Sequence, residues 1–266
     1  ITDSIVYFSG EFGRFNVGAT DGATYLLQVQ APSADANYDG MDQYFTPFNY
    51  AATDVTQLSK LEFDYDQDAS NTADKITYIS PLYNGLQYGV SWTPESRTAS
   101  RGLSGMDDSI GLSNELDFAL RYEHETGFGS YRLGAGYTDA ESRQIWNGAV
   151  DLDVGAFGIG AVYTHDDQDE KGAADTWTGA TGQRQWILGA DYTVGDLTYA
   201  VSYLNQNNEF SANDIQTDRY TGGVTYRAGA GVDFRGIVTY IDHNVDAALG
   251  HDVSGTAGMV GTSITF

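Results

Sequence analysis

Cysteine is absent from the 266 residues, and basic residues are scarce, with 13 Lys and Arg against 37 Asp and Glu. The missing cysteines exclude a disulfide scaffold and a zinc ribbon, both of which need thiols. The formal net charge of −24 repels phosphate backbones, so the composition argues against nucleic-acid binding, which depends on clustered Lys and Arg. Hydrophobic residues still make up 41% of the chain. We therefore expect a folded chain with a single domain over 1–266.

Long apolar runs are also scarce, and we expect that any secretory signal has been removed or was never included in this sequence. The longest nearly uncharged apolar stretch, 154–163, is about half of what a membrane-spanning helix needs. The first residues, Ile1 to Ser4, contain no initiator Met, no basic segment and no apolar segment of a secretory signal. The mean hydropathy is −0.35. Two β classes stay open: an acidic soluble protein, or a transmembrane β-barrel whose strands need only about ten residues of alternating polarity.

Polarity alternates with a period of two along most of the chain. Large side chains occupy the even positions of 116–124, while the odd positions between them are small or charged. After the turn at 126–129 the alternation resumes over 130–140, which predicts a hairpin. Tight glycine turns alternate with polar connections such as 166–182 and 207–217, as is typical of outer-membrane barrels. Thirteen strands are predicted: 4–9, 14–19, 74–80, 86–93, 114–125, 130–140, 145–154, 157–166, 184–194, 197–207, 218–228, 232–243 and 255–266.

Each predicted strand has one apolar and one polar face. The apolar faces carry aromatics toward their ends, such as Trp186 and Tyr192, which suits the two interfacial girdles of a barrel. A soluble antiparallel sandwich is the alternative. Against it, the alternation continues to a C-terminal Phe266, and the polar faces carry side chains that a dry core does not accommodate. These are Gln87, Asp117, Arg121, Arg132, Asp151, Asp153, Asp191, Arg227, Asp233 and Arg235.

Three segments resemble the general porins of Gram-negative outer membranes, particularly those of alphaproteobacteria. They are the strand, glycine turn and strand at 7–18, the hairpin at 74–89 and the terminal Phe266. In that family sixteen antiparallel strands form the barrel, and the third external loop folds inward between the fifth and sixth strands. The resemblance implies that 19–73 contains this constriction loop and that Phe266 is the assembly signal for barrel insertion. Only two predicted strands precede the loop, so we expect three further N-terminal strands in a longer mature protein.

The same resemblance implies a function. It predicts a water-filled pore, integral to the bacterial outer membrane, for the passive diffusion of small hydrophilic solutes and ions. It also implies a homotrimer that contacts outer-membrane lipid and lipopolysaccharide, and it requires no cofactor. A substrate-specific channel for sugars or small acids is the alternative. The number of tyrosines does not separate the two, because most of them face lipid in the predicted strands.

The segment 19–50 is too long for an ordinary connection and contains a helix-compatible piece, 22–28. If it folds inward, its carboxylates oppose basic side chains on the wall and set a transverse field across the pore. A mobile acidic surface loop is the alternative. The candidate acidic residues are Asp35, Asp39 and Asp42, and the candidate wall residues are Arg14, Lys75, Arg121 and Arg132. Arg14 and Lys75 come first because they flank the loop, and the excess of carboxylates predicts cation selectivity at low salt.

Alternating aspartates offer oxygen ligands that suit calcium at Asp64, Asp66 and Asp68. Residue 69 is Ala where an EF-hand loop requires Gly, so the segment is not an EF-hand. We keep these three residues as a candidate calcium site, with a solvated acidic loop as the alternative. A second candidate set is Asp166, Asp167, Asp169 and Glu170.

Enzymatic activity is the competing class of function. Metal-ligand spacing is absent among the four histidines, His124, His165, His243 and His251, and no Ser stands in the sequence context of a nucleophile elbow. His124 and His165 fall at the ends of outward stripes, where an interfacial histidine is the commoner explanation. The sequence therefore predicts a protein that is not an enzyme.

Overall fold

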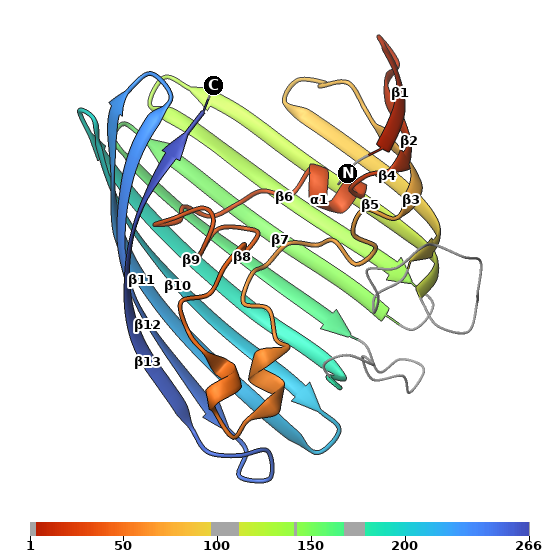
Figure 1. Ribbon diagram of the computed structural model, residues 1–266. Coiled ribbons are helices and arrows are strands. Elements are labelled where there is room, and N and C mark those ends of the chain that lie inside the picture. Colours follow the sequence, from red (N-terminus) through yellow and green to blue (C-terminus); the bar gives the residue numbers. More distant parts are fainter. Residues whose placement is uncertain (1–3, 97–111, 141–142, 168–178, 266) are drawn as a thin grey trace.

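The computed structural model describes residues 4–96, 112–140, 143–167 and 179–265. The described chain forms one antiparallel sheet of 13 strands, which follow one another in sequence order (Figure 1). The strands are β1 (Ser4–Gly10), β2 (Gly13–Ala19), β3 (Asp74–Ile79), β4 (Leu86–Ser96), β5 (Leu112–Thr126), β6 (Gly129–Ala140), β7 (Arg143–Val154), β8 (Phe157–Asp167), β9 (Gly182–Val194), β10 (Leu197–Phe210), β11 (Asn213–Gly229), β12 (Val232–Val245) and β13 (Val253–Ile264). The all-β fold and the thirteen predicted strands are confirmed. β1 and β13 form the two edges of the sheet.

Three short helices lie within the connection between β2 and β3: α1 (Ala23–Leu26), η1 (Tyr50–Ala52) and η2 (Thr56–Ser59). The helix α1 falls inside the predicted piece 22–28, and Gly22 is its N-cap. No helix in the described residues is long and apolar enough to cross a membrane.

The outward face of the sheet is apolar and accessible. Val201 and Val238 are 58% and 61% exposed in the middle of their strands, where a soluble sandwich would bury such side chains. The strand register places aromatics in a row across the middle of β10, β11 and β12, where Tyr203 pairs with Tyr220 and Tyr220 with Tyr240. Tyr192 and Tyr199 pair near the tight turn that joins β9 to β10. An apolar band between two aromatic rows is the surface that a lipid bilayer covers.

The tight turns at one end of the sheet depend on residues that accept positive φ. Between β3 and β4, Asn84 has φ 50° and Gly85 has φ 88°, which is the combination that a type I′ hairpin turn requires. A Cβ on Gly85 would lie 2.1 Å from the carbonyl oxygen of Glu123, so glycine is needed for space as well as for conformation.

One predicted loop is wrong. Residues 207–217 do not form a long polar connection, because β10 continues to Phe210 and β11 begins at Asn213. The outward side chains of this hairpin are polar, while Ile215 and Phe210 point inward and are buried. They pack in one core with Leu58 and Phe63 of the β2–β3 connection. The strands therefore continue beyond the apolar outward band because their inner face has its own apolar partner.

Candidate functional site

The inner face of the sheet is covered by the segment 20–73, which crosses it from β4 to β12 and returns (Figure 1). Glycines on the wall let its first half approach closely. A Cβ on Gly134 would lie 2.9 Å from Val29, and one on Gly189 would lie 2.0 Å from the carbonyl oxygen of Pro32. Farther along, the Tyr38 hydroxyl hydrogen-bonds to Thr239 on β12 at 3.1 Å. The segment thus lies against the polar face of the sheet, opposite the face with the aromatic rows.

Amide side chains on the wall and on the segment hold its returning half, 62–68. The Nε2 of Gln206 donates to the carbonyl oxygen of Glu62 at 2.9 Å, and that of Gln185 donates to the carbonyl oxygen of Asp64. In the opposite direction, Gln67 of the segment donates to the wall, from its Nε2 to the carbonyl oxygen of Ile145 on β7 at 3.1 Å. These three glutamines are almost fully buried, so the polar backbone of the segment is satisfied without the burial of a charge.

The three candidate acidic residues have different surroundings. Asp39 is 1% exposed and accepts hydrogen bonds from the Ala34 and Asp35 amides and from the Ser202 hydroxyl, so it fixes a turn of the segment against β10. Asp35 forms an ion pair with Arg235 of β12 at 3.2 Å. Asp42 is half-buried and accepts a hydrogen bond from the Tyr25 hydroxyl at 2.8 Å.

The structure pairs three of the four candidate wall cations with groups on their own strands or hairpins, and it pairs Lys75 with the end of the segment. Arg14 donates to Asn16 Oδ1 at 2.7 Å, and Lys75, which is 2% exposed, donates to the Asn71 carbonyl oxygen. Arg121 pairs with Glu123, with Nε 2.6 Å from the carboxylate. Arg132 pairs with Asp151 and, at 2.9 Å, with Asp153. Among the described residues, none of these four cations forms an ion pair with the three candidate acidic residues.

Two arginines on the last strands also contact the segment. Besides the ion pair of Arg235, Arg219 on β11 is 2% exposed, donates to the Tyr38 carbonyl oxygen at 3.4 Å and lies 5.0 Å from the Tyr38 ring centroid. The alternation already placed Arg235 on the inner face, and the same alternation holds for Arg219 because its neighbour Tyr220 faces outward. The sequence therefore indicated that both arginines face inward, but it did not indicate that the segment runs toward β11 and β12.

A group of carboxylates gathers on the segment itself. Asp64, Asp66 and Asp68 alternate with Tyr65 and Gln67, which pack against other parts of the segment and the wall. Burial and the nearby Glu62 raise the pKa of Asp64 to about 7. Burial, together with Asp64 and Asp68 on either side, raises the pKa of Asp66 well above its usual range.

The pKa of Asp68 is raised to about 7, mainly by burial, against the opposing effect of the Lys75 ammonium. Across the described part of the chain, no three carboxylates or imidazoles are placed to hold a metal ion. The calcium site at Asp64, Asp66 and Asp68 stays a prediction. Asp169, Glu170 and Phe266 lie outside the described residues.

The four histidines are dispersed over the sheet. His124 and His165 stand on the outward face, each 5.5 Å between ring centroids from an aromatic neighbour, Tyr131 and Trp146. His243 is buried, and its Nδ1 lies 2.8 Å from the Thr217 hydroxyl. His251, in the connection between β12 and β13, forms an ion pair with Asp54 of the segment at 2.5 Å.

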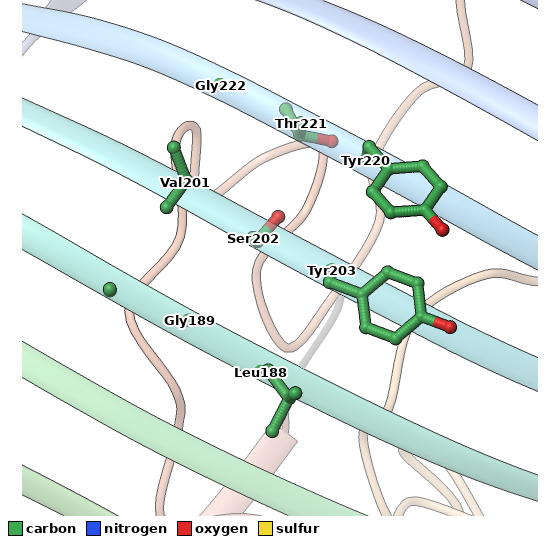
Figure 2. Close-up of a pocket in the computed structure, with 9 residues that line it drawn as sticks. Leu188, Gly189, Val201, Ser202, Tyr203, Tyr220, Thr221 and Gly222 are labelled. Atoms are coloured by element: carbon green, nitrogen blue, oxygen red, sulfur yellow. The ribbon is translucent and has the colours of Figure 1, made fainter.

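Two hollows occur on opposite faces of the sheet. One, of about 510 Å³, lies on the outward apolar face between Leu188, Val201 and Tyr203, where Figure 2 shows the rings of Tyr203 and Tyr220 side by side on neighbouring strands. The other, of about 310 Å³, lies on the inner face between the segment at 28–32 and wall residues such as Arg121 and Arg132. Only the second is polar and bounded by the inner segment, so it is the cavity that a solute in a lumen would meet.

The family profile of the Gram-negative porins matches this chain over residues 1–246. Outer membrane protein U of Vibrio parahaemolyticus is 23% identical over 253 residues, which cover 91% of this chain and 69% of that protein. An uncharacterised protein of Rickettsia conorii is 20% identical over 270 residues, which cover 85% of this chain. The chain spans 59% of the length of that relative.

Solved structures show the same fold. The anion-selective porin from Comamonas acidovorans has a TM-score of 0.60 at 15% identity, and the similarity covers 98% of this chain and 75% of that one. At this level of sequence identity, the similarity shows a shared fold. It does not show that the two proteins share the side chains that line a pore. The family profile nevertheless matches nearly the whole sheet together with the segment that crosses it. The chain therefore belongs to the Gram-negative porin family, whose members are integral proteins of the bacterial outer membrane.

Proposed function

We propose that this protein is an outer-membrane pore for the passive diffusion of small hydrophilic solutes and ions, with a preference for cations. The segment 20–73 acts as its constriction, since it lies on the polar face of the sheet and its backbone is held there by buried amides. The opposite face is apolar and suits lipid. No reaction is part of the proposal.

The cation preference rests on one observation, the set of carboxylates that the segment presents. Asp42 and Asp64 accept hydrogen bonds from the Tyr25 hydroxyl and from the Gln43 amide. Both donors are neutral, so they do not cancel the negative charge of Asp42, nor that of Asp64 once the pH exceeds its raised pKa. Asp42, Asp64 and Asp68 each add to the rise in the pKa of Asp66, so these carboxylates lie within electrostatic reach of one another. Concentrated negative charge in a narrow aqueous passage attracts cations and repels anions.

The selectivity of a structural relative does not transfer to this chain. The Comamonas porin is anion-selective by its title, but it shares only 15% of aligned residues with this chain. Ion selectivity depends on the side chains at the narrowest section, which sequences this distant do not share by default.

We further propose a homotrimer, assembled through the outward face of the last two strands. In this region Gly236 pairs with Val260, and Val238 pairs with Gly258. Val260 is 93% exposed, and the two glycines leave the backbone open to close approach. These small residues differ from the aromatic row that crosses β10, β11 and β12, and they suit contact with a second barrel wall.

The test is a planar-bilayer recording of the full-length protein purified from outer membrane, under a KCl gradient at a pH above the raised pKa of Asp64 and Asp68. We expect large ohmic conductance that closes in three equal steps, with a reversal potential on the cation-selective side. Replacing Asp42, Asp64 and Asp68 together with Asn should move the reversal potential toward zero, whereas Asp196→Asn in an exposed tight turn should leave it unchanged. An anion-selective reversal potential would contradict the cation preference. Small conductance steps that one particular solute blocks would instead indicate a substrate-specific channel.

A further inference from the structure

The inner cavity of about 310 Å³ is lined by several charged side chains. The segment contributes Gln28, Val29, Gln30, Ala31 and Pro32, and the wall contributes Arg121, Arg132, Asp151, Asp153 and Asp191 from β5, β6, β7 and β9. A water molecule takes about 30 Å³ of liquid volume, so the cavity has room for a solute of several heavy atoms.

Both arginines of this cavity already have carboxylate partners. Arg121 Nε lies 2.6 Å from Glu123 Oε1. Arg132 donates through Nε to Asp151 Oδ2 at 2.6 Å and through Nη2 to Asp153 Oδ2 at 2.9 Å. An anion entering the cavity would have to displace one of these carboxylates. The arginines therefore do not make the cavity an anion site.

Asp191 is the carboxylate without a cation. It is half-buried, and within the described ranges it forms no hydrogen bond or ion pair. Its Oδ1 and the Oδ1 of Asp153 lie 2.2 and 3.2 Å from the point that a Cβ on Gly158 would occupy. The missing side chain of Gly158 thus leaves two carboxylate oxygens facing one small volume, and the Asp153 contact with Arg132 goes through the other oxygen, Oδ2.

We propose that this cavity is a subsite for a small organic ammonium ion in transit, an inference that rests on the pore function proposed above. The ammonium group lies between the free Oδ1 atoms of Asp153 and Asp191 and donates charge-assisted hydrogen bonds to both. The alkyl part of the solute lies along Pro32 and the side chain of Gln30, the accessible residues of the segment in this cavity. A compact ammonium group with three donors fits two separate carboxylates, whereas a metal ion needs a tighter set of ligands than the described residues provide.

The lining explains why the subsite selects by charge and size. The described carboxylates of the cavity, together with Glu123, outnumber its two arginines, so the cavity is electrostatically attractive to a cation. Gln28 is held by its own hydrogen bonds to Tyr65 and Gln67, which keeps the wall formed by the segment in place. The solute is retained near the constriction before it passes on.

The experiment is a bilayer recording of the full-length protein in about 0.1 M KCl, a salt concentration at which charges within about 10 Å still interact. The probe is propylammonium chloride, and sodium propionate is the charge-reversed probe of similar size. We expect the ammonium ion, and not the propionate, to reduce the open-channel current with a saturable concentration dependence. Asp191→Asn should weaken the apparent affinity about tenfold.

Two variants separate the subsite from a general effect of charge. Asp191→Glu keeps the carboxylate and should retain the block, while Asp233→Asn removes an inward charge of β12 outside this cavity and should leave it unchanged. Equal block in Asp191→Asn and the wild type would overturn the subsite. A conducting wild-type pore without ammonium block would also overturn it and leave the pore function intact. Folded protein without conductance would overturn both the subsite and the pore function.

Discussion

At the scale of single residues, the raised pKa values of carboxylates on the inner segment make the charge of the proposed pore depend on pH. Asp64 and Asp68 titrate near pH 7 instead of near 4, because burial penalises their ionised forms. A raised carboxyl pKa means that the folded protein holds these protons at a pH where an unfolded chain has lost them. Both groups are mainly neutral below pH 7 and mainly ionised above it, so the negative charge of the lumen grows across the physiological range.

Cation selectivity should therefore depend on pH. When the pH rises from about 5.5 to about 8.5, through the raised pKa of Asp64 and Asp68, the reversal potential under a fixed KCl gradient should become more cation-selective. The double variant Asp64→Asn and Asp68→Asn should lose most of this dependence, while Asp196→Asn should keep it. A wild-type reversal potential that is flat over this range would show that these carboxylates do not face the permeating ions.

Residue patterns in the sequence predicted much of the inner face, but not the pairs formed there. The alternation of polarity placed Arg121, Arg132 and Arg235 on the inner face, where the structure has them. Position next to the loop favoured Arg14 and Lys75, yet Asp35 pairs with Arg235, two hundred residues away. Such pairs depend on the path of an irregular segment, and no local periodicity encodes that path.

At the scale of elements, the segment 20–73 has two differently anchored halves. Its first half packs small and apolar residues onto wall glycines, and its second half is tied by buried glutamines. The sequence predicted the helix at 22–28 but took 207–217 for a loop, because the outward side chains of that hairpin are polar. Its inward residues, Ile215 and Phe210, carried the missing signal, since they pack against the segment.

Removing two glutamine anchors should free the second half of the segment without unfolding the sheet. In the double variant Gln185→Ala and Gln206→Ala, the carbonyl oxygens of Glu62 and Asp64 lose buried donors, at a cost of about 1–3 kcal/mol each. We expect faster amide hydrogen exchange in 62–68 and larger open-channel current noise. Gln57→Ala, at a half-buried glutamine of the same segment outside 62–68, serves as the control. Unchanged exchange in 62–68 would mean that other contacts hold this half.

At the scale of the whole molecule, a sheet with one lipid-compatible face and one polar face follows directly from the alternation. Strand hydrogen bonds satisfy the backbone between neighbours, which lets an acidic chain of negative mean hydropathy occupy a membrane. Fold and family could be predicted from the sequence because they repeat strand after strand. The cavity beside Asp191 could not, because it forms where strands β5 to β9 meet the segment from far along the chain.

The most direct test of a pore constricted by this segment uses the absence of cysteine from these 266 residues. A single Asp42→Cys variant should react with a positively charged methanethiosulfonate reagent while the current of one channel is recorded. Because residue 42 is half-buried on the inner segment, we expect each reaction to lower the conductance in a discrete step and to reduce cation selectivity. Asp196→Cys, in an exposed turn, should react without either change. Complete modification at residue 42, verified by intact mass, with conductance and reversal potential unchanged would contradict the account.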